Sequence, residues 1–169
     1  MKLYKPKWYQ KSIYDIDYHK LKEKGIKYLI FDLDNTLGKI DEEECSMKVK
    51  DFLDKLKTDF TILIVSNNSK DRVLKFCKGL TDDVLYLALK PTSKTFGFIR
   101  KYTKNMQEVC MIGDQIVTDI ITGNRFKMMT ILVDPLENKD MKITSLNRFI
   151  ERRLISKLKL KKGEYYEEN

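Results

Sequence analysis

Histidine, cysteine and proline are scarce in this chain. Its 169 residues include one histidine, three cysteines and three prolines. Cys45, Cys77 and Cys110 are unequally spaced and form no CxxC pair, and the single histidine is His19, so a metal–thiolate site is not expected. Cys77 and Cys110 lie in apolar stretches, which is typical of reduced cysteines in a core.

Long apolar runs are also missing. No stretch approaches the roughly 18 consecutive apolar residues of a membrane-spanning helix. The N-terminal sequence MKLYKPKWYQKSIYDIDYHK lacks the apolar region of a signal peptide. The sequence contains no internal repeat, low-complexity tract or linker rich in Pro, Gly and Ser. We therefore expect a protein of the cytoplasm, or of a compartment reached without cleavage, with a single domain over residues 1–169 and its core at about residues 25–135.

Positive charge is abundant and lies mainly at the two ends. The formal net charge is +8, from 33 basic and 25 acidic side chains. Residues 1–27 hold eight lysines and three acidic residues, and residues 139–162 hold nine basic and two acidic residues. The basic N-terminal segment is taken as residues 1–24. The excess favours an anionic partner, which could be nucleic acid, an anionic membrane or a phosphorylated substrate.

The C-terminal basic region also has helical periodicity. It predicts a basic amphipathic helix over about residues 144–162. Such a helix can pack on its own domain with a solvated basic face, or it can bind at a membrane surface. Its apolar residues are Leu146, Phe149, Ile150, Leu154 and Leu158.

Five short apolar runs predict strands that are covered on both faces. Helical periodicity appears between them, in residues 46–58, 69–80 and 92–105. Alternating strands and helices predict an α/β fold with a central parallel sheet. The expected strands are residues 27–33, 60–66, 84–89, 109–114 and 129–133.

Polar sequences follow four of these strands: DLDNT, SNN, LKPTSK and GDQIVTD. The carboxyl ends of parallel strands meet at one edge of a sheet, so these sequences should converge there. Carboxylates at Asp32, Asp34 and Asp114 would suit a hard cation such as Mg²⁺. Ser66 could donate to a phosphate oxygen, and a lysine of LKPTSK could neutralise negative charge.

In this order, DLDNT, the serine of IVSNN, the lysine of LKP and GDQIVTD resemble the four motifs of the haloacid dehalogenase (HAD) superfamily. The resemblance covers about residues 25–135. Residues 12–37 and 113–136 are similar to the capless YqeG-type group of subclass IIIA, which is related to the phosphatidylglycerophosphate phosphatases of mitochondria and chloroplasts. The resemblance implies a HAD-like Rossmannoid three-layer sandwich with no cap domain.

The resemblance also implies catalytic roles for the acidic residues. Asp32 would attack phosphorus and form an aspartyl phosphate, and Asp34 would act as general acid and then as general base. Magnesium would be held by Asp32, by the backbone carbonyl of Asp34 and by Asp114. Thr36 and Asp119 would support this centre.

The remaining motif residues are expected to bind the phosphoryl group. Ser66 and the backbone N–H of Asn67 would bind its oxygens, and Lys90 would stabilise the negative charge. Lys94 is the alternative to Lys90 because both lie in the third motif, and the adjoining proline favours Lys90.

Taken together, the resemblance implies a Mg²⁺-dependent phosphomonoesterase that converts phosphatidylglycerophosphate to phosphatidylglycerol. The short spacing between motifs leaves no room for a cap, and an open site suits a phosphate on a large molecule. The basic ends would then contact the anionic inner face of a membrane. Two alternatives keep the fold: the same chemistry on a nucleic-acid end or a phosphoprotein, or a non-catalytic protein that binds RNA or a membrane.

Overall fold

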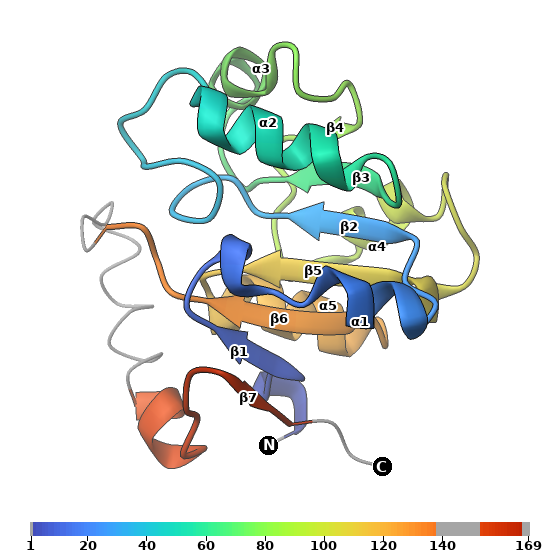
Figure 1. The fold of residues 1–169 in the computed structure, drawn as a ribbon, viewed down its shortest axis with the longest axis vertical. Coiled ribbons are helices and arrows are strands. Elements are labelled where there is room, and N and C mark those ends of the chain that lie inside the picture. Colours follow the sequence, from blue (N-terminus) through green and yellow to red (C-terminus); the bar gives the residue numbers. More distant parts are fainter. Residues whose placement is uncertain (1, 138–152, 167–169) are drawn as a thin grey trace.

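A seven-stranded sheet in the order β4-β3-β2-β5-β6-β1-β7 forms the centre of the molecule (Figure 1). The computed structural model describes residues 2–137 and 153–166. All neighbouring strands are parallel except β1 and β7. The predicted α/β architecture is thus confirmed, with one antiparallel strand added at an edge. The strands are β1 (Trp8–Gln10), β2 (Tyr28–Phe31), β3 (Thr61–Val65), β4 (Val84–Leu85), β5 (Val109–Gly113), β6 (Met129–Val133) and β7 (Glu164–Tyr165).

Helices cover both faces of the sheet and make three layers. Alternate side chains of β2 point to opposite faces, so Leu29 and Phe31 belong to one apolar cluster and Ile30 to another. The first cluster includes side chains of α1, α2 and α3, and the second includes side chains of α4. The helices are α1 (Tyr18–Glu23), α2 (Met47–Leu56), α3 (Lys70–Cys77), α4 (Ser93–Ile99) and α5 (Ile121–Arg125).

Side-chain caps set where four of these helices begin, and at α1 Asp17 accepts from the backbone N–H of Lys20. Ser46 accepts a hydrogen bond from a backbone N–H in the first turn of α2, Ser69 does so for α3, and Thr92 does so for α4. Each cap satisfies a backbone donor that has no partner inside the helix. The expected helical regions therefore agree with α2, α3 and α4, apart from the residues at their ends.

The strand expected over residues 84–89 was predicted too long. It ends at Leu85, because Leu87 and Leu89 have φ values of 45° and 53°. These values lie in the left-handed region, which a β-strand cannot contain. The strand β4 is consequently a two-residue edge strand followed by an irregular loop.

The strands β1 and β7 were not predicted from the sequence. They bring the two ends of the described chain together, since β1 pairs with β6 on one side and with β7 on the other. Trp8 is fully buried, and its ring lies 4.8 Å from that of Tyr165 in an edge-on arrangement. The Lys20 ammonium lies 3.9 Å from the centre of the Tyr165 ring. The basic N-terminal segment is therefore part of the folded domain.

The predicted amphipathic helix lies partly outside the described residues, which resume at 153. Residues 153–157 are helical. Leu154, Ile155 and Leu158 pack against a cluster that contains Tyr9 and the buried Leu160. The apolar side of this C-terminal segment thus faces its own domain. Among the described residues no helix is both long and apolar enough to span a bilayer.

The C-terminal segment should therefore contribute to stability. We expect Leu160→Ala to lower the free energy of unfolding by about 2–4 kcal/mol, because it leaves a cavity beside Tyr9. Urea denaturation would measure the change. Lys161→Ala, at the exposed neighbouring residue, should change it by less than about 0.5 kcal/mol. Equal stability of the two variants would contradict the packing described here.

Candidate active site

Four buried polar side chains lie where strands β2, β3 and β5 end. Asp32 directly follows β2, Ser66 follows β3 and Asp114 follows β5. Asp119 comes from a π-helical turn, Ile116–Ile120, that precedes α5. The parallel order β3-β2-β5 makes these strand ends neighbours, so the sheet itself gathers the side chains.

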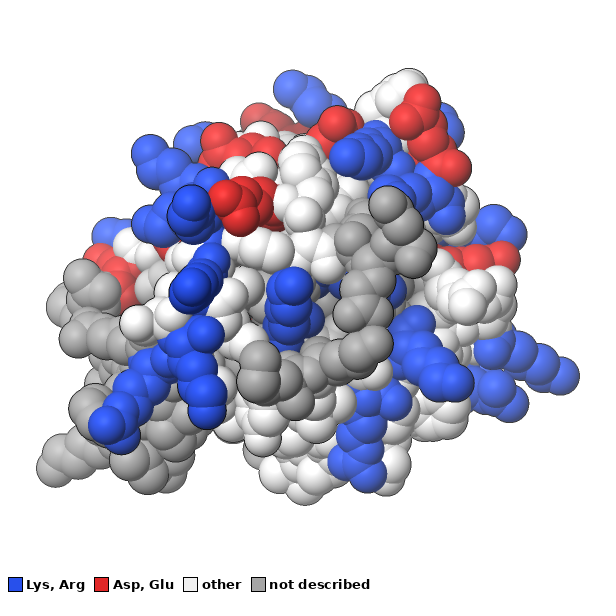
Figure 2. Space-filling view, turned by 90° about the horizontal axis from the view of Figure 1, so that it is seen from below, with Lys and Arg blue, Asp and Glu red and all other residues white. Residues whose placement is uncertain are grey.

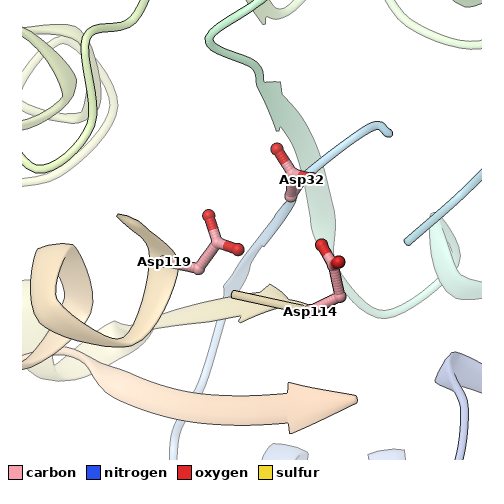
Figure 3. Close-up of side chains that lie close together, drawn as sticks. All are labelled: Asp32, Asp114 and Asp119. Carbon is pink, nitrogen blue, oxygen red and sulfur yellow. The ribbon is translucent and has the colours of Figure 1, made fainter. Parts of the chain in front are cut away.

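Three of the carboxylates form a tight group, as Figure 3 shows. One oxygen from each of Asp32, Asp114 and Asp119 lies within 4.8 Å of the others. The Lys90 ammonium donates to Asp32 Oδ1 at 2.5 Å, to Asp119 Oδ1 at 2.7 Å and to the carbonyl of Val65 at 2.9 Å. An ammonium has three donors, so these acceptors use all of them.

The buried group has more negative than positive charge. Burial and the neighbouring carboxylates raise the pKa of Asp32 well above its ordinary value, although Lys90 acts in the opposite direction. Burial lowers the pKa of Lys90, but the charges of Asp119 and Asp32 outweigh it, so the pKa is raised and the lysine is protonated. With all three carboxylates ionised, the carboxylates and the one ammonium carry a formal charge of −2. A divalent cation would balance it, and close, buried oxygen ligands suit Mg²⁺.

Asp119 and Thr36 hold other members of the group in place. Asp119 Oδ2 accepts from the backbone N–H of Gln115 at 3.1 Å, while its other oxygen accepts from Lys90. The Thr36 hydroxyl donates a hydrogen bond to Asp114 Oδ1 at 3.2 Å. Because both Asp119 oxygens are already engaged, this residue orients Lys90 and the loop after β5. Both residues, for which a supporting role is expected from sequence, thus lie in contact with members of the group.

The loops of the second and third motifs are joined by hydrogen bonds. The Lys90 backbone N–H donates to Asn67 Oδ1 at 2.7 Å, and Ser66 Oγ accepts from the backbone N–H of Asn68 at 3.1 Å. Lys94 donates instead to the backbone carbonyl of Leu87 and is exposed. The structure therefore places Lys90, and not Lys94, against Asp32.

Asp34 lies outside the buried group and is held by a residue that sequence analysis missed. Arg72 Nη2 donates to Asp34 Oδ1 at 2.9 Å and to the carbonyl of Lys39 at 3.0 Å, and Nη1 donates to the carbonyl of Glu42. Asn68 Nδ2 donates to the other Asp34 oxygen at 3.1 Å.

Arg72 thereby joins Asp34 to the flap, which we define as residues 37–45 between the first motif and α2. Its position in the first turn of the helix after SNN is the sequence signal that could have identified it.

Comparisons with known proteins show what the chain is similar to. The model of the HAD-hydrolase-like family matches residues 88–139, and that of the mitochondrial PGP (phosphatidylglycerophosphate) phosphatases matches residues 1–77. The chain is 37% identical over 169 residues to "Probable phosphatase YqeG" of Bacillus subtilis (strain 168), covering 99% of this chain and 98% of that protein. It is 29% identical over 143 residues to the chloroplastic/mitochondrial phosphatidylglycerophosphate phosphatase 1 of Arabidopsis thaliana, covering 77% of this chain and 40% of that protein.

Solved structures share the fold. A Bacillus subtilis protein, YfnB, described as a HAD-hydrolase and bound to magnesium, superposes with a TM-score of 0.56 at 12% identity, over 70% of this chain and 91% of that one. An uncharacterized protein from Listeria monocytogenes serotype 4b gives a TM-score of 0.56 at 18% identity, over 69% of this chain and 85% of that one. At these identities the likeness concerns the fold alone.

Gly113 provides a test of the role of Asp119. A Cβ atom at Gly113 would lie 2.2 Å from Asp119 Oδ2, so alanine there must displace a fully buried carboxylate. We expect Gly113→Ala to lower phosphatase activity by roughly 10- to 100-fold, because Lys90 loses its support, and to destabilise the fold by about 1–3 kcal/mol.

Initial rates and thermal unfolding would measure these two effects. Gly97→Ala, on α4 with open space around the added Cβ, is the matched control: it should leave the initial rate unchanged and should raise the stability slightly, because alanine is the better helix former. Normal activity of Gly113→Ala would show that the position of Asp119 is unimportant.

Arg72 provides a test of how Asp34 is held. Arg72→Gln removes the charge and two of the contacts to the flap, so we expect kcat to fall roughly 10- to 100-fold. Arg72→Lys should recover part of the loss, since it restores the charge but not the forked geometry. The measurement is steady-state kinetics on an aryl phosphate, with circular dichroism to verify folding. Equal kcat for all three proteins would exclude a positioning role.

Proposed function

The chain belongs to the HAD family of phosphatases, and from this premise we propose that it is a Mg²⁺-dependent phosphomonoesterase that acts on phosphatidylglycerophosphate through an aspartyl phosphate. The observation that carries the proposed chemistry is the contact of Lys90 with both Asp32 and Asp119 inside a buried acidic group. Phosphoryl transfer depends mainly on positioning and charge neutralisation. This group offers both.

Asp32 is the proposed nucleophile. Its carboxylate forms a bond to phosphorus while the bond from phosphorus to the leaving alcohol breaks, and Asp34 gives the leaving oxygen a proton. Asp34 then takes a proton from a water molecule, which cleaves the aspartyl phosphate and releases inorganic phosphate. The two carboxylates have different surroundings, since Asp32 is buried beside Lys90 and Asp34 is partly exposed beside Arg72.

The other motif residues bind charge. Lys90 offsets the charge of Asp32 and the phosphoryl group, while Ser66 and the backbone N–H of Asn67 bind phosphoryl oxygens. Magnesium would be held by Asp32, Asp114 and the backbone carbonyl of Asp34, and it would neutralise the negative charge that collects between nucleophile and phosphate.

Two features support a lipid phosphate as substrate. The first is the match to the mitochondrial PGP phosphatase model over residues 1–77, together with the similarity to the Arabidopsis enzyme of that name. The second is the absence of a cap: residues 37–65 contain only the flap, α2 and β3, and residues 67–89 contain only α3 and β4 with their loops. An uncapped site can receive a phosphate that stays attached to a large assembly such as a bilayer.

The direct test is phosphate release from phosphatidylglycerophosphate in mixed micelles with Mg²⁺. We expect Asp32→Asn to reduce release to background, because an amide cannot form the acyl phosphate. Chelation of divalent cations should also stop release, and excess Mg²⁺ should restore it. Asp82→Asn, at an exposed aspartate before β4, is the matched control and should behave like the wild type.

Different results would refute the substrate assignment and the proposed mechanism. Cleavage of an aryl phosphate without cleavage of the lipid would refute the lipid assignment and keep the phosphatase mechanism. In that case a phosphoprotein and a 3′- or 5′-phosphorylated oligonucleotide are the next substrates to assay. Full activity of Asp32→Asn would refute the mechanism itself.

A further inference from the structure

Three exposed leucines lie on the carboxyl edge of the sheet, where the candidate site opens. Leu87 is 47% exposed, Leu89 is 59% exposed and Leu136 is 45% exposed. Single exposed leucines are common on protein surfaces. These three, however, all come from loops that follow strands at the active edge: two follow β4 and one follows β6.

Hydrogen bonds fix two of the leucines beside Asp34, from opposite sides. The Leu87 N–H donates to the carbonyl of Asn68 at 2.9 Å, and the Asn68 side chain itself donates to Asp34. The Leu136 N–H donates to the carbonyl of Asn35 at 3.0 Å, one residue beyond Asp34. Since β4 and β6 lie on opposite sides of β2, the site has an apolar rim on both sides. We call Leu87, Leu89 and Leu136 the leucine rim.

The backbone of the rim is unfavourable for leucine. Leu87 and Leu89 have φ values of 45° and 53°, a region in which a residue with a Cβ atom is disfavoured. Lys94 helps to hold this loop, since its ammonium donates to the carbonyl of Leu87. Disfavoured conformations persist where the surrounding structure imposes them, and they are concentrated at functional sites.

A basic segment lies at the same edge. Lys162 pairs with Asp134, the residue that follows β6, at 2.6 Å. The apolar residues of this segment pack inward. Its exposed surface is therefore basic. Figure 2 looks from below Figure 1 onto the side of the sheet that carries β1 and β7, and it shows lysine and arginine spread widely over that side. The exposed basic residues are Arg153, Lys157, Lys159, Lys161 and Lys162.

The flap carries the opposite charge and limits where an anionic surface could lie. Asp41, Glu43 and Glu44 are exposed there, although Glu43 pairs with Lys75. The flap leads into α2, on the side of the sheet opposite α4. The basic segment packs on Leu132, Ile116 and Ile120 instead. Anionic phosphates are thus favoured beside the basic segment and disfavoured beside the flap.

We propose that the carboxyl edge docks on the surface of an anionic bilayer, with the leucine rim entering the apolar interface and residues 153–162 contacting lipid phosphates. The proposal rests on the lipid substrate proposed above and names the surface by which the site would reach it. The apolar side of the C-terminal segment has no part in this contact, because it packs on the domain. Basic side chains and apolar insertion are the two contributions by which peripheral proteins bind such surfaces.

Flotation with vesicles tests the docking surface. The vesicles contain phosphatidylcholine with about 30% phosphatidylglycerol, or phosphatidylcholine alone, to separate apolar from electrostatic binding. We expect the triple variant Leu87→Gln, Leu89→Gln, Leu136→Gln to bind the anionic vesicles at least about 10-fold more weakly. Leu3→Gln is the matched control, since Leu3 is 39% exposed but precedes β1 at the opposite edge. It should bind like the wild type.

A second variant tests the charge. Lys157→Gln, Lys159→Gln, Lys161→Gln should weaken binding to anionic vesicles and leave binding to neutral vesicles unchanged. The competing surface is the amino edge, where Lys7 and Lys127 line a cavity of about 540 Å³. If Lys7→Gln, Lys127→Gln loses vesicle binding while the leucine variant keeps it, the proposal is overturned.

Hydrolysis rates on a lipid and on a soluble substrate distinguish a failure of the docking surface from a failure of the proposed function. For the leucine variant we expect the rate on vesicle-borne phosphatidylglycerophosphate, divided by the rate on a soluble aryl phosphate, to fall at least about 10-fold. An unchanged ratio would overturn the docking surface even if the lipid is the substrate. If the wild type fails to cleave the lipid yet its vesicle binding depends on the rim, the proposed substrate is wrong and the docking surface is supported.

Discussion

The contact of Lys90 with two carboxylates is the interaction on which this site depends. Buried like charges repel, and three carboxylates at this distance would not stay together without compensation. Lys90 compensates one charge and fixes the directions of Asp32 and Asp119 at once. The remaining deficit of positive charge is what makes the site suitable for a divalent cation, whose charge would in turn attract a phosphoryl group.

The register of the sheet positions the residues that make this contact. Phe31 pairs in register with Ile64 on β3 and with Ile112 on β5. Asp32 is therefore level with Val65, whose carbonyl accepts from Lys90, and with Gly113, which precedes Asp114. Gly113 then lets Asp119 approach the strand end, because no Cβ atom stands between them. A shift of one residue in either pairing would move Asp32 to the other face of the sheet.

The shared location of Asp32, Ser66 and Asp114 at one edge of the sheet could be predicted from sequence, because each directly follows a strand whose apolar pattern is continuous. Residues whose role depends on partners far away in the sequence could not be predicted in this way. The sequence signal for Arg72 is only its position in the first turn of the helix after SNN, and its contacts with the flap carbonyls become visible in the structure. β1 and β7 are too short for a periodic signal. The apolar sequence around Leu87 predicts a strand, and only its positive φ in the structure shows that the strand has already ended.

The net charge of the chain and the charges of the site lie in different parts of the molecule. In the described part of the chain, the basic side chains that contact the site carboxylates are Lys90 and Arg72. Most of the net charge of +8 lies in the terminal regions, outside the site. Charges spread over a surface act on position and encounter, whereas buried charges act on the reaction. If the proposed function holds, a chain that pairs an uncapped acidic centre with basic ends would separate how it finds an anionic substrate from how it transfers the phosphoryl group.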